Sequence, residues 1–229
     1  LAAATDEKMM NIIYEEDQKR VEESIGQQFL NGNEYEVEYR IVGKGGKLTW
    51  VNDIGKKIIT EDGREAMISI MTDISDRRAR EKQLIQEAYY DPLTGLYNRK
   101  KAISLYEEAF ANGQKGTFFI CDIDNFKSIN DTYGHEVGDE ILLKLSERVN
   151  KELDGRHTFA RFGGDEFVIA FSRVHDENEI RELLNKLLVS VRKPIEVNNK
   201  SIYCSISLGV SMYPRDADNL DILLKTADM

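Results

Sequence analysis

Four acidic residues carry the strongest chemical signal in the sequence. Asp122 and Asp124 follow an apolar run at residues 117–121 that predicts a buried strand, and strand residues two apart project to the same side. Asp165 and Glu166 lie in a glycine-rich turn that predicts a hairpin. Any one of these acids alone is explained as a solvated turn residue. If the strand lies beside the hairpin, however, the carboxylates converge and repel one another until a cation neutralises them. Oxygen donors without a nearby His or Cys favour Mg²⁺ or Mn²⁺ over zinc.

The elements that would position these acids alternate between helix and strand. Helical periodicity marks three segments, at residues 102–110, 137–149 and 180–191. Strand patterns mark four more, at residues 117–121, 158–162, 167–171 and 203–210. The resulting βαββαβ order predicts an α+β fold in which helices back a mainly antiparallel sheet.

The first part of the chain has a different pattern. A helix around residues 16–30 precedes three strand-like runs separated by glycine turns, at residues 34–42, 47–51 and 66–72. This pattern predicts an antiparallel meander with one helix. A charged helical stretch at residues 77–90 follows, which we interpret as an interdomain linker able to pair with a copy of itself.

Composition excludes several classes of partner. The net charge of −10 and the isoelectric point near 5.0 argue against a nucleic-acid or anionic-lipid binder. No apolar run approaches the roughly 18 residues that span a bilayer, so we expect no membrane contact within this segment. Cys121 and Cys204 lie in apolar runs, which indicates buried free thiols and a cytoplasmic protein. The chain lacks an initiator Met, so we expect a fragment whose parent protein holds any membrane anchor.

Several separated motifs together carry a family resemblance. They are residues 91–99 (DPLTGLYNR), residues 122–131 (DIDNFKSIND), Gly134-His135, Gly138-Asp139 and residues 161–167 (RFGGDEF). At this spacing, residues 91–229 resemble the GGDEF family, the diguanylate cyclase domains. The resemblance implies a nucleotidyl-cyclase fold, with a palm-like antiparallel sheet and flanking helices.

The resemblance also implies a reaction. Such domains are nucleotidyltransferases that condense two GTP into the bacterial second messenger cyclic di-GMP and release two pyrophosphates. By position, the side chains of Asp122, Asp165 and Glu166 and the carbonyl of Ile123 would bind two divalent ions, Mg²⁺ or Mn²⁺, in each active site. Asp165, Glu166 and Lys127 would be catalytic, with Asp165 or a metal-bound oxygen assisting deprotonation of the attacking ribose 3′-hydroxyl.

Nucleotide recognition would involve Lys127 again and three further positions. The backbone after Phe126 and the side chain of Lys127 would hold the terminal phosphates of GTP. Asn130 would pair with the guanine edge, and the acceptor-only Asp139 suits guanine N1–H and its exocyclic amine. The alternative is that Asp139 N-caps a helix ending near residue 153 and that Asn130 caps a turn. The resemblance favours guanine recognition.

Two departures from the family pattern bear on activity. The product-inhibition motif Arg-x-x-Asp would begin nine residues before Gly163, where residues 154–157 instead read DGRH, so we expect no primary inhibitory site. Residues 223–229 resemble the start of the final family helix, whose later basic residues contact phosphates. The GGDEF domain is therefore expected to be truncated at its C-terminus, and the fragment to bind GTP weakly or turn over poorly.

The N-terminal part resembles the later half of a PAS sensor domain. Residues 35–41, 47–51 and 67–77 are similar to its last three strands and exit motif, whereas its early strands are missing or shortened. We therefore predict a partial PAS domain at residues 1–76, a helical linker at 77–90 and a GGDEF domain at 91–229. Half a cavity buries a ligand poorly, which favours a dimerising or signal-relaying role over cofactor binding.

These observations lead to one leading hypothesis with two alternatives. The leading one is a diguanylate cyclase in signal transduction, controlled by the PAS module and active as a homodimer, because one site holds one GTP whereas the product joins two. The first alternative is a catalytically weak or inactive GTP-binding regulatory module, from a protein with a downstream phosphodiesterase domain. The second is a dinucleotide cyclase of relaxed specificity. Retention of Asp122, Asp165 and Glu166 favours an enzyme, and Asp139 argues against relaxed specificity.

Overall fold

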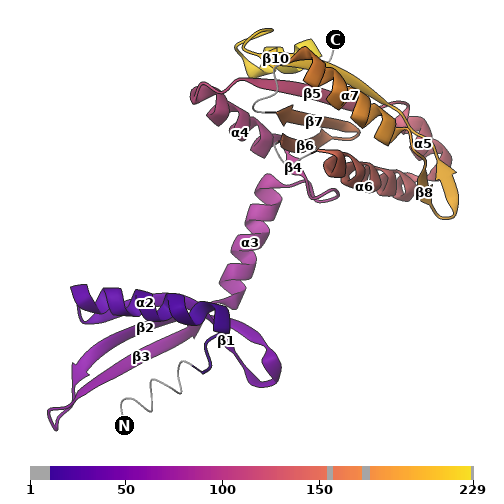
Figure 1. Cartoon of the computed structure of the whole chain (residues 1–229). Coiled ribbons are helices and arrows are strands. Elements are labelled where there is room, and N and C mark those ends of the chain that lie inside the picture. Colours follow the sequence, from indigo (N-terminus) through magenta and orange to yellow (C-terminus); the bar gives the residue numbers. More distant parts are fainter. Residues whose placement is uncertain (1–10, 154–156, 172–175, 228–229) are drawn as a thin grey trace. The chain divides into compact units, whose positions relative to one another are not determined.

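The chain divides into two compact units, Leu1–Leu84 and Ile85–Met229, and each is described separately (Figure 1). The computed structural model describes residues 11–153, 157–171 and 176–227. The division lies inside helix α3 (Ser75–Tyr89), so the domain boundaries expected after residues 76 and 90 stay predictions. No helix within the described ranges has both the length and the apolar composition needed to cross a bilayer.

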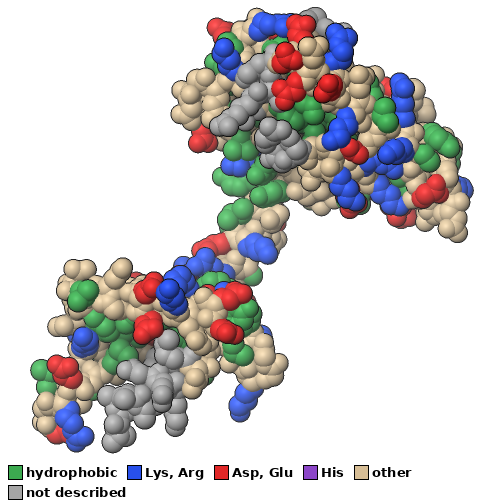
Figure 2. Space-filling view, in the orientation of Figure 1, with side chains coloured by type: hydrophobic (Ala, Val, Ile, Leu, Met, Phe, Trp, Pro, Cys, Tyr) green, Lys and Arg blue, Asp and Glu red, His purple; other side chains and the backbone are tan. Residues whose placement is uncertain are grey.

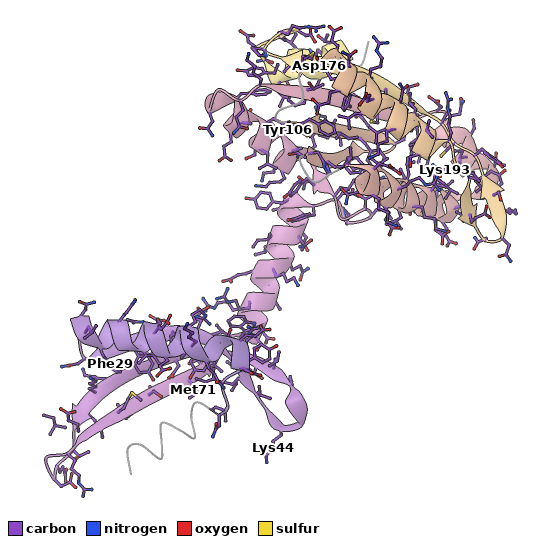
Figure 3. The ribbon with its side chains drawn as sticks, in the orientation of Figure 1. Phe29, Lys44, Met71, Tyr106, Asp176 and Lys193 are labelled. Carbon is purple, nitrogen blue, oxygen red and sulfur yellow. The ribbon has the colours of Figure 1, made fainter. Side chains whose placement is uncertain are left out.

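The first unit is the helix and meander that the sequence predicts. Its elements are α2 (Glu15–Asn31), β1 (Glu34–Val42), a 3₁₀ turn (Lys44–Gly46), β2 (Leu48–Ile59) and β3 (Glu65–Asp73). The strands pair antiparallel in the order β1-β2-β3. α2 packs on β1 through a small core around Val21, Tyr35, Val37 and Tyr39, with Phe29 of the same helix directed toward the sheet (Figure 3). β2 extends to Ile59, beyond the predicted residues 47–51. The prediction was too short because polar and apolar residues alternate less regularly in the second half of the strand.

A buried carboxylate joins β1 to β2 in this core. Asp53 is fully buried, and the hydroxyls of Tyr35 and Tyr39 donate to its Oδ2 at 3.0 and 2.9 Å. Burial, together with the neighbouring Asp53, raises the pKa of Tyr39. Gly55 makes room for this arrangement, since a Cβ there would lie 2.1 Å from Cε1 of Tyr35. The side chain of Tyr35 therefore requires glycine at residue 55.

An ion pair attaches α2 to β1. The backbone N–H and Nε of Arg40 each donate to Oδ2 of Asp17 at 2.9 Å, and Nη2 donates to Oδ1 at 2.7 Å. Asp17 is 5% exposed. The side-chain hydrogen bond from Arg40 is the largest of the effects that lower the pKa of Asp17, to about 2. The folded state therefore favours the ionised carboxylate.

This ion pair predicts a specific acid dependence of stability. Because the folded pKa of Asp17 is about 2 and its ordinary value is 3.8, its contribution is present above pH 4 and lost as the pH falls toward 2. We expect a loss of about 2 kcal/mol over that window, which Asp17→Asn abolishes. Fluorescence of Trp50, the one tryptophan in the chain, measures this unfolding. Glu22→Gln, at an exposed position of α2, is the control, and an unchanged acid slope in Asp17→Asn contradicts the assignment.

The second unit is an α+β domain built on a five-stranded sheet, as the sequence predicts. Its helices are α4 (Arg99–Ala111), α5 (Phe126–Tyr133), α6 (His135–Glu152), α7 (Glu177–Val191) and α8 (Leu220–Ala227). Its strands are β4 (Tyr97–Asn98), β5 (Gly116–Ile123), β6 (His157–Gly163), β7 (Glu166–Phe171), β8 (Ile195–Val197), β9 (Lys200–Ile202) and β10 (Ile206–Tyr213). The sheet order is β10-β5-β7-β6-β4, antiparallel except for β4 beside β6.

Helices cover both faces of this sheet. On one face, α6 and α7 bury Phe119 and Cys121 of β5, and on the other, α4 and α8 bury Phe118 and Ile120. Tyr106 points from α4 toward the sheet, where its ring packs edge-on against that of Phe118 (Figure 3). Burial on both faces explains why β5 is a continuous apolar run instead of an alternating one.

Three features of this unit were not predicted. The short parallel strand β4 and the β8–β9 hairpin carry too little periodicity to be recognised. Helix α5 was not marked by helical periodicity, and Gly134, which adopts a φ of +89°, separates it from α6. Arg148 of α6 attaches the end of α7 and the segment after it, since it donates to the carbonyls of Ser190 and Pro194. Figure 2 shows that basic side chains gather on one face of this unit.

Candidate active site

The register between β5 and β7 brings two predicted acids together. Asp122 is paired directly with Glu166, and it is also paired with Ser207 of β10 on its other side. Directly paired residues of antiparallel strands lie on the same face, with Cβ atoms about 5 Å apart. Asp122 is exposed and Glu166 is partly buried. Two carboxylates thus face solvent together at one end of the sheet.

The turn between β6 and β7 places a third acid beside this pair. Gly164 and Asp165 connect Gly163 to its paired residue Glu166, and the register shifts between Arg161 and Gly163. Gly163 has a φ of +147° and Gly164 a φ of +53°, so both positions favour glycine. The glycines therefore allow the tight turn that holds Asp165 next to Glu166.

Arg161 fixes this turn to the start of the unit. Its Nε and Nη2 donate to the carbonyl of Gly164 at 3.0 and 2.8 Å, and its Nη1 donates to Oδ1 and Oδ2 of Asp91 at 3.0 and 3.2 Å. Burial works against the ionised form of Asp91, but hydrogen bonds from Thr94 and Arg161 hold its pKa below the usual value. The peptide immediately before Asp165 is consequently anchored by a partly buried ion pair.

Asp124 has a different environment from Asp122. Its carboxylate accepts hydrogen bonds from the hydroxyls of Ser205 and Ser207, the latter at 2.6 Å, and these bonds lower its pKa. Asp124 is therefore held against β10. Ser205 lies just before β10 and Ser207 lies within it. Sequence reasoning missed this contact, because no local pattern signals it.

The donor chemistry of the site fits a hard divalent cation. Asp122, Asp165 and Glu166 offer carboxylate oxygens, and Ile123 is buried at the end of β5. Within the described ranges, however, no three His, Cys, Asp or Glu side chains are placed to hold a metal ion together. The metal roles of these residues and of the Ile123 carbonyl stay predictions.

The first turn of α5 lies directly after β5. Asn125 precedes this helix with a φ of +56°, and its side chain does not cap it. Phe126 is buried, whereas Lys127 is exposed and makes no ion pair or hydrogen bond with any residue that the structure describes. The open amides and positive end of the helix dipole, with this free ammonium group, form an environment suited to an anion.

The two residues expected at guanine lie on neighbouring helices. Asn130 belongs to α5, and Asp139 is exposed on the second turn of α6. The alternative N-cap role of Asp139 is wrong, because α6 begins at His135 after Gly134. The backbone carbonyl of Asn130 accepts from the N–H of Gly134 at 2.8 Å, so its side chain is not what closes this turn. Of the inhibitory motif position at residues 154–157, residues 154–156 lie outside the described residues.

Comparison with known sequences identifies the family to which this fold belongs. The family described as diguanylate cyclase, GGDEF domain, matches residues 88–229, and the PAS fold family matches residues 3–71. The chain belongs to the GGDEF family of diguanylate cyclase domains.

Individual relatives agree with this assignment. Protein y4lL of Sinorhizobium fredii is 31% identical over 96% of this chain and 28% of its own length. The cyclic di-GMP phosphodiesterase NbdA of Pseudomonas aeruginosa is 35% identical over 64% of this chain and 19% of its own length. The protein named Probable diguanylate cyclase DgcC of Escherichia coli is 36% identical over 61% of this chain and 38% of its own length. The chain thus spans well under half the length of these relatives.

A solved structure shows the same fold. The sensory box/GGDEF family protein from Caulobacter crescentus has 31% sequence identity and a TM-score of 0.56, covering 62% of this chain and 94% of the other. The α+β fold predicted for the second unit is confirmed, and the relatives connect the family to cyclic di-GMP signalling.

The anchoring role of Arg161 can be measured. Arg161→Ala removes the cation beside Asp91, whose side chain is 15% exposed, so we expect a loss of about 3 kcal/mol in unfolding free energy. Faster amide hydrogen exchange at residues 164–166 should accompany it. The control is Arg215→Ala, because the Arg215–Glu177 pair is 60% and 73% exposed and should contribute under about 1 kcal/mol. Equal, small losses in both variants would refute the anchoring role.

Proposed function

We propose that this chain is a diguanylate cyclase that condenses two GTP into cyclic di-GMP and releases two pyrophosphates. The observation that carries the proposal is the pairing of Asp122 with Glu166 at the strand end, beside Asp165 and the open first turn of α5. Phosphoryl transfer needs positioning and charge neutralisation more than a covalent nucleophile, and this arrangement supplies groups for both. Membership of the family supports the same reaction.

Each site would hold the triphosphate of one GTP between α5 and the acids. The amides after Phe126 and the Lys127 ammonium group bind the terminal phosphates. Asp122, Asp165, Glu166 and the Ile123 carbonyl would hold two Mg²⁺ or Mn²⁺ ions. When bound, these ions neutralise phosphate charge and stabilise the attacking and leaving oxygens.

The bond changes are simple and occur twice for each product. The ribose 3′-oxygen of one GTP bonds to the α-phosphorus of the other, and the bond from that phosphorus to the β-bridging oxygen breaks, which releases pyrophosphate. The carboxylate of Asp165, which lies at the β6–β7 turn, or a metal-bound oxygen would accept the proton of the 3′-hydroxyl. The second, equivalent attack closes the ring.

Guanine is selected by complementary donors and acceptors. Asp139 accepts from N1–H and the exocyclic amine, and Asn130 pairs with the remaining polar edge. Adenine lacks this donor pair, so ATP would leave the Asp139 carboxylate without partners. This argument favours GTP over the relaxed-specificity alternative.

The reaction requires two copies of the chain, and we infer that the helical segment controls their geometry. In the first unit, Arg77 and Arg78 of α3 donate to Glu38 of β1. In the second, Asn98 donates to the carbonyl of Ala88 at the other end of the same helix, at 3.0 Å. The helix is thus fixed to each unit at one end, as a relay from a PAS module to a cyclase requires.

Activity of the acid pair provides the first test. With GTP and Mg²⁺, the wild-type chain should form cyclic di-GMP, while Asp122→Asn and Glu166→Gln should each lower the rate at least about a hundredfold. Glu182→Gln, exposed on α7, is the matched control. Chromatography and mass spectrometry of the product decide the result. GTP binding without any product would support the regulatory-module alternative instead.

Dimerisation makes a separate kinetic prediction. Because each copy contributes one GTP, specific activity should rise with protein concentration until the dimer is saturated. Measuring initial rates across a wide range of concentrations, with the oligomeric state followed by light scattering, tests this. A strict monomer with constant specific activity would rule out the two-fold arrangement.

A further inference from the structure

Gly138 lies at a close contact between α5 and α6. It is buried, and a Cβ at this position would lie 1.9 Å from Oδ1 of Asn130, 3.0 Å from its Cγ and 3.3 Å from Cζ of Phe126. Non-bonded carbon atoms rest about 3.5–4.0 Å apart, so any side chain here displaces the Asn130 amide. Only glycine permits the observed position of Asn130.

The Asn130 amide is held in this place without a hydrogen bond to its oxygen. Its Oδ1 is buried and has no partner among the described residues. A buried acceptor without a partner is unfavourable, and such groups mark positions where packing over-determines a side chain. Because one end of the amide lies against Gly138, the plane of the amide and the direction of its other end are fixed.

We propose that Gly138 is a positioning residue for guanine selection. Because Gly138 has no Cβ, the Asn130 amide can pack against its backbone, and this contact orients Asn130 toward the base, beside the carboxylate of Asp139. The inference rests on the proposed function. Guanine presents the O6 acceptor next to the N1–H and amine donors, so a fixed amide donor and an adjacent carboxylate match it. Gly138 and Asp139 are consecutive, so one turn of α6 supplies both the glycine that positions Asn130 and the carboxylate that accepts from guanine.

Four variants of the chain, with both units present, test this role. They are Gly138→Ala, Asn130→Ala, the double variant, and Gly26→Ala as a control at a helical glycine with nothing within 4 Å of its added Cβ. The readouts are affinities for non-hydrolysable GTP and ATP analogues with Mg²⁺, and thermal unfolding. The ratio of the two affinities separates guanine selection from general damage to the phosphate site.

We expect Gly138→Ala to lower the affinity for the GTP analogue about tenfold or more and to leave the affinity for the ATP analogue unchanged. In the Asn130→Ala background the same change should add little, because the two residues act through one contact. The double variant should also unfold at a higher temperature than Gly138→Ala, since truncation of Asn130 removes the clash. Gly26→Ala should retain wild-type affinity for both analogues.

Three results would overturn the inference. They are a GTP:ATP preference unchanged by Gly138→Ala, an equal loss for both nucleotides, and additive effects of the two substitutions on that preference. Failure of the proposed function gives a different result. A wild-type chain that prefers GTP but forms no cyclic di-GMP disproves the cyclase activity and leaves the positioning role of Gly138 supported. A wild-type chain without a preference for GTP over ATP refutes the role of Gly138 in guanine selection, even if the unfolding temperatures of the variants confirm the contact between Gly138 and Asn130.

Discussion

The antiparallel register of β5 against β7 is the constraint on which the site depends. It places Asp122 opposite Glu166, although like charges across a strand pair repel. A shift of one residue would move every side chain of β5 to the opposite face. Phe119 and Cys121 pack in one layer and Phe118 in the other, so the register is specified by the core on both sides. Burial of apolar side chains thus maintains an acidic pair that favours a cation.

Backbone geometry around the pair completes the arrangement. Glycines 163 and 164 make the turn tight enough to keep Asp165 beside Glu166, and Arg161 attaches that turn to Asp91. Gly134 separates α5 from α6 and lets the two helices pack closely. The reactive groups are therefore positioned by rigid elements and by glycines whose conformations other residues rarely adopt.

Much of this was predictable because it depends on local pattern. Alternating apolar residues predicted strands of the first unit, continuous apolar runs predicted strands such as β5, and the glycine turn predicted the hairpin that carries Asp165. The links between distant segments, such as Arg161 with Asp91 and Asp124 with Ser207, were not visible because they depend on tertiary packing. The capping alternative for Asp139 was wrong since a left-handed glycine at 134 starts the helix earlier than periodicity suggests. Metal binding and residue roles stay proposals.

Binding of Mn²⁺ tests the central claim most directly. Electron paramagnetic resonance can follow Mn²⁺ titrated into the chain with a non-hydrolysable GTP analogue, for the wild type, Asp122→Asn and Asp124→Asn. If the Asp122–Glu166 pair holds the cation, wild-type protein binds Mn²⁺ with the nucleotide and Asp122→Asn loses most of that binding. Asp124→Asn should reduce Mn²⁺ binding much less, because Ser205 and Ser207 hydrogen-bond the Asp124 carboxylate. Undiminished Mn²⁺ binding in Asp122→Asn would contradict the account.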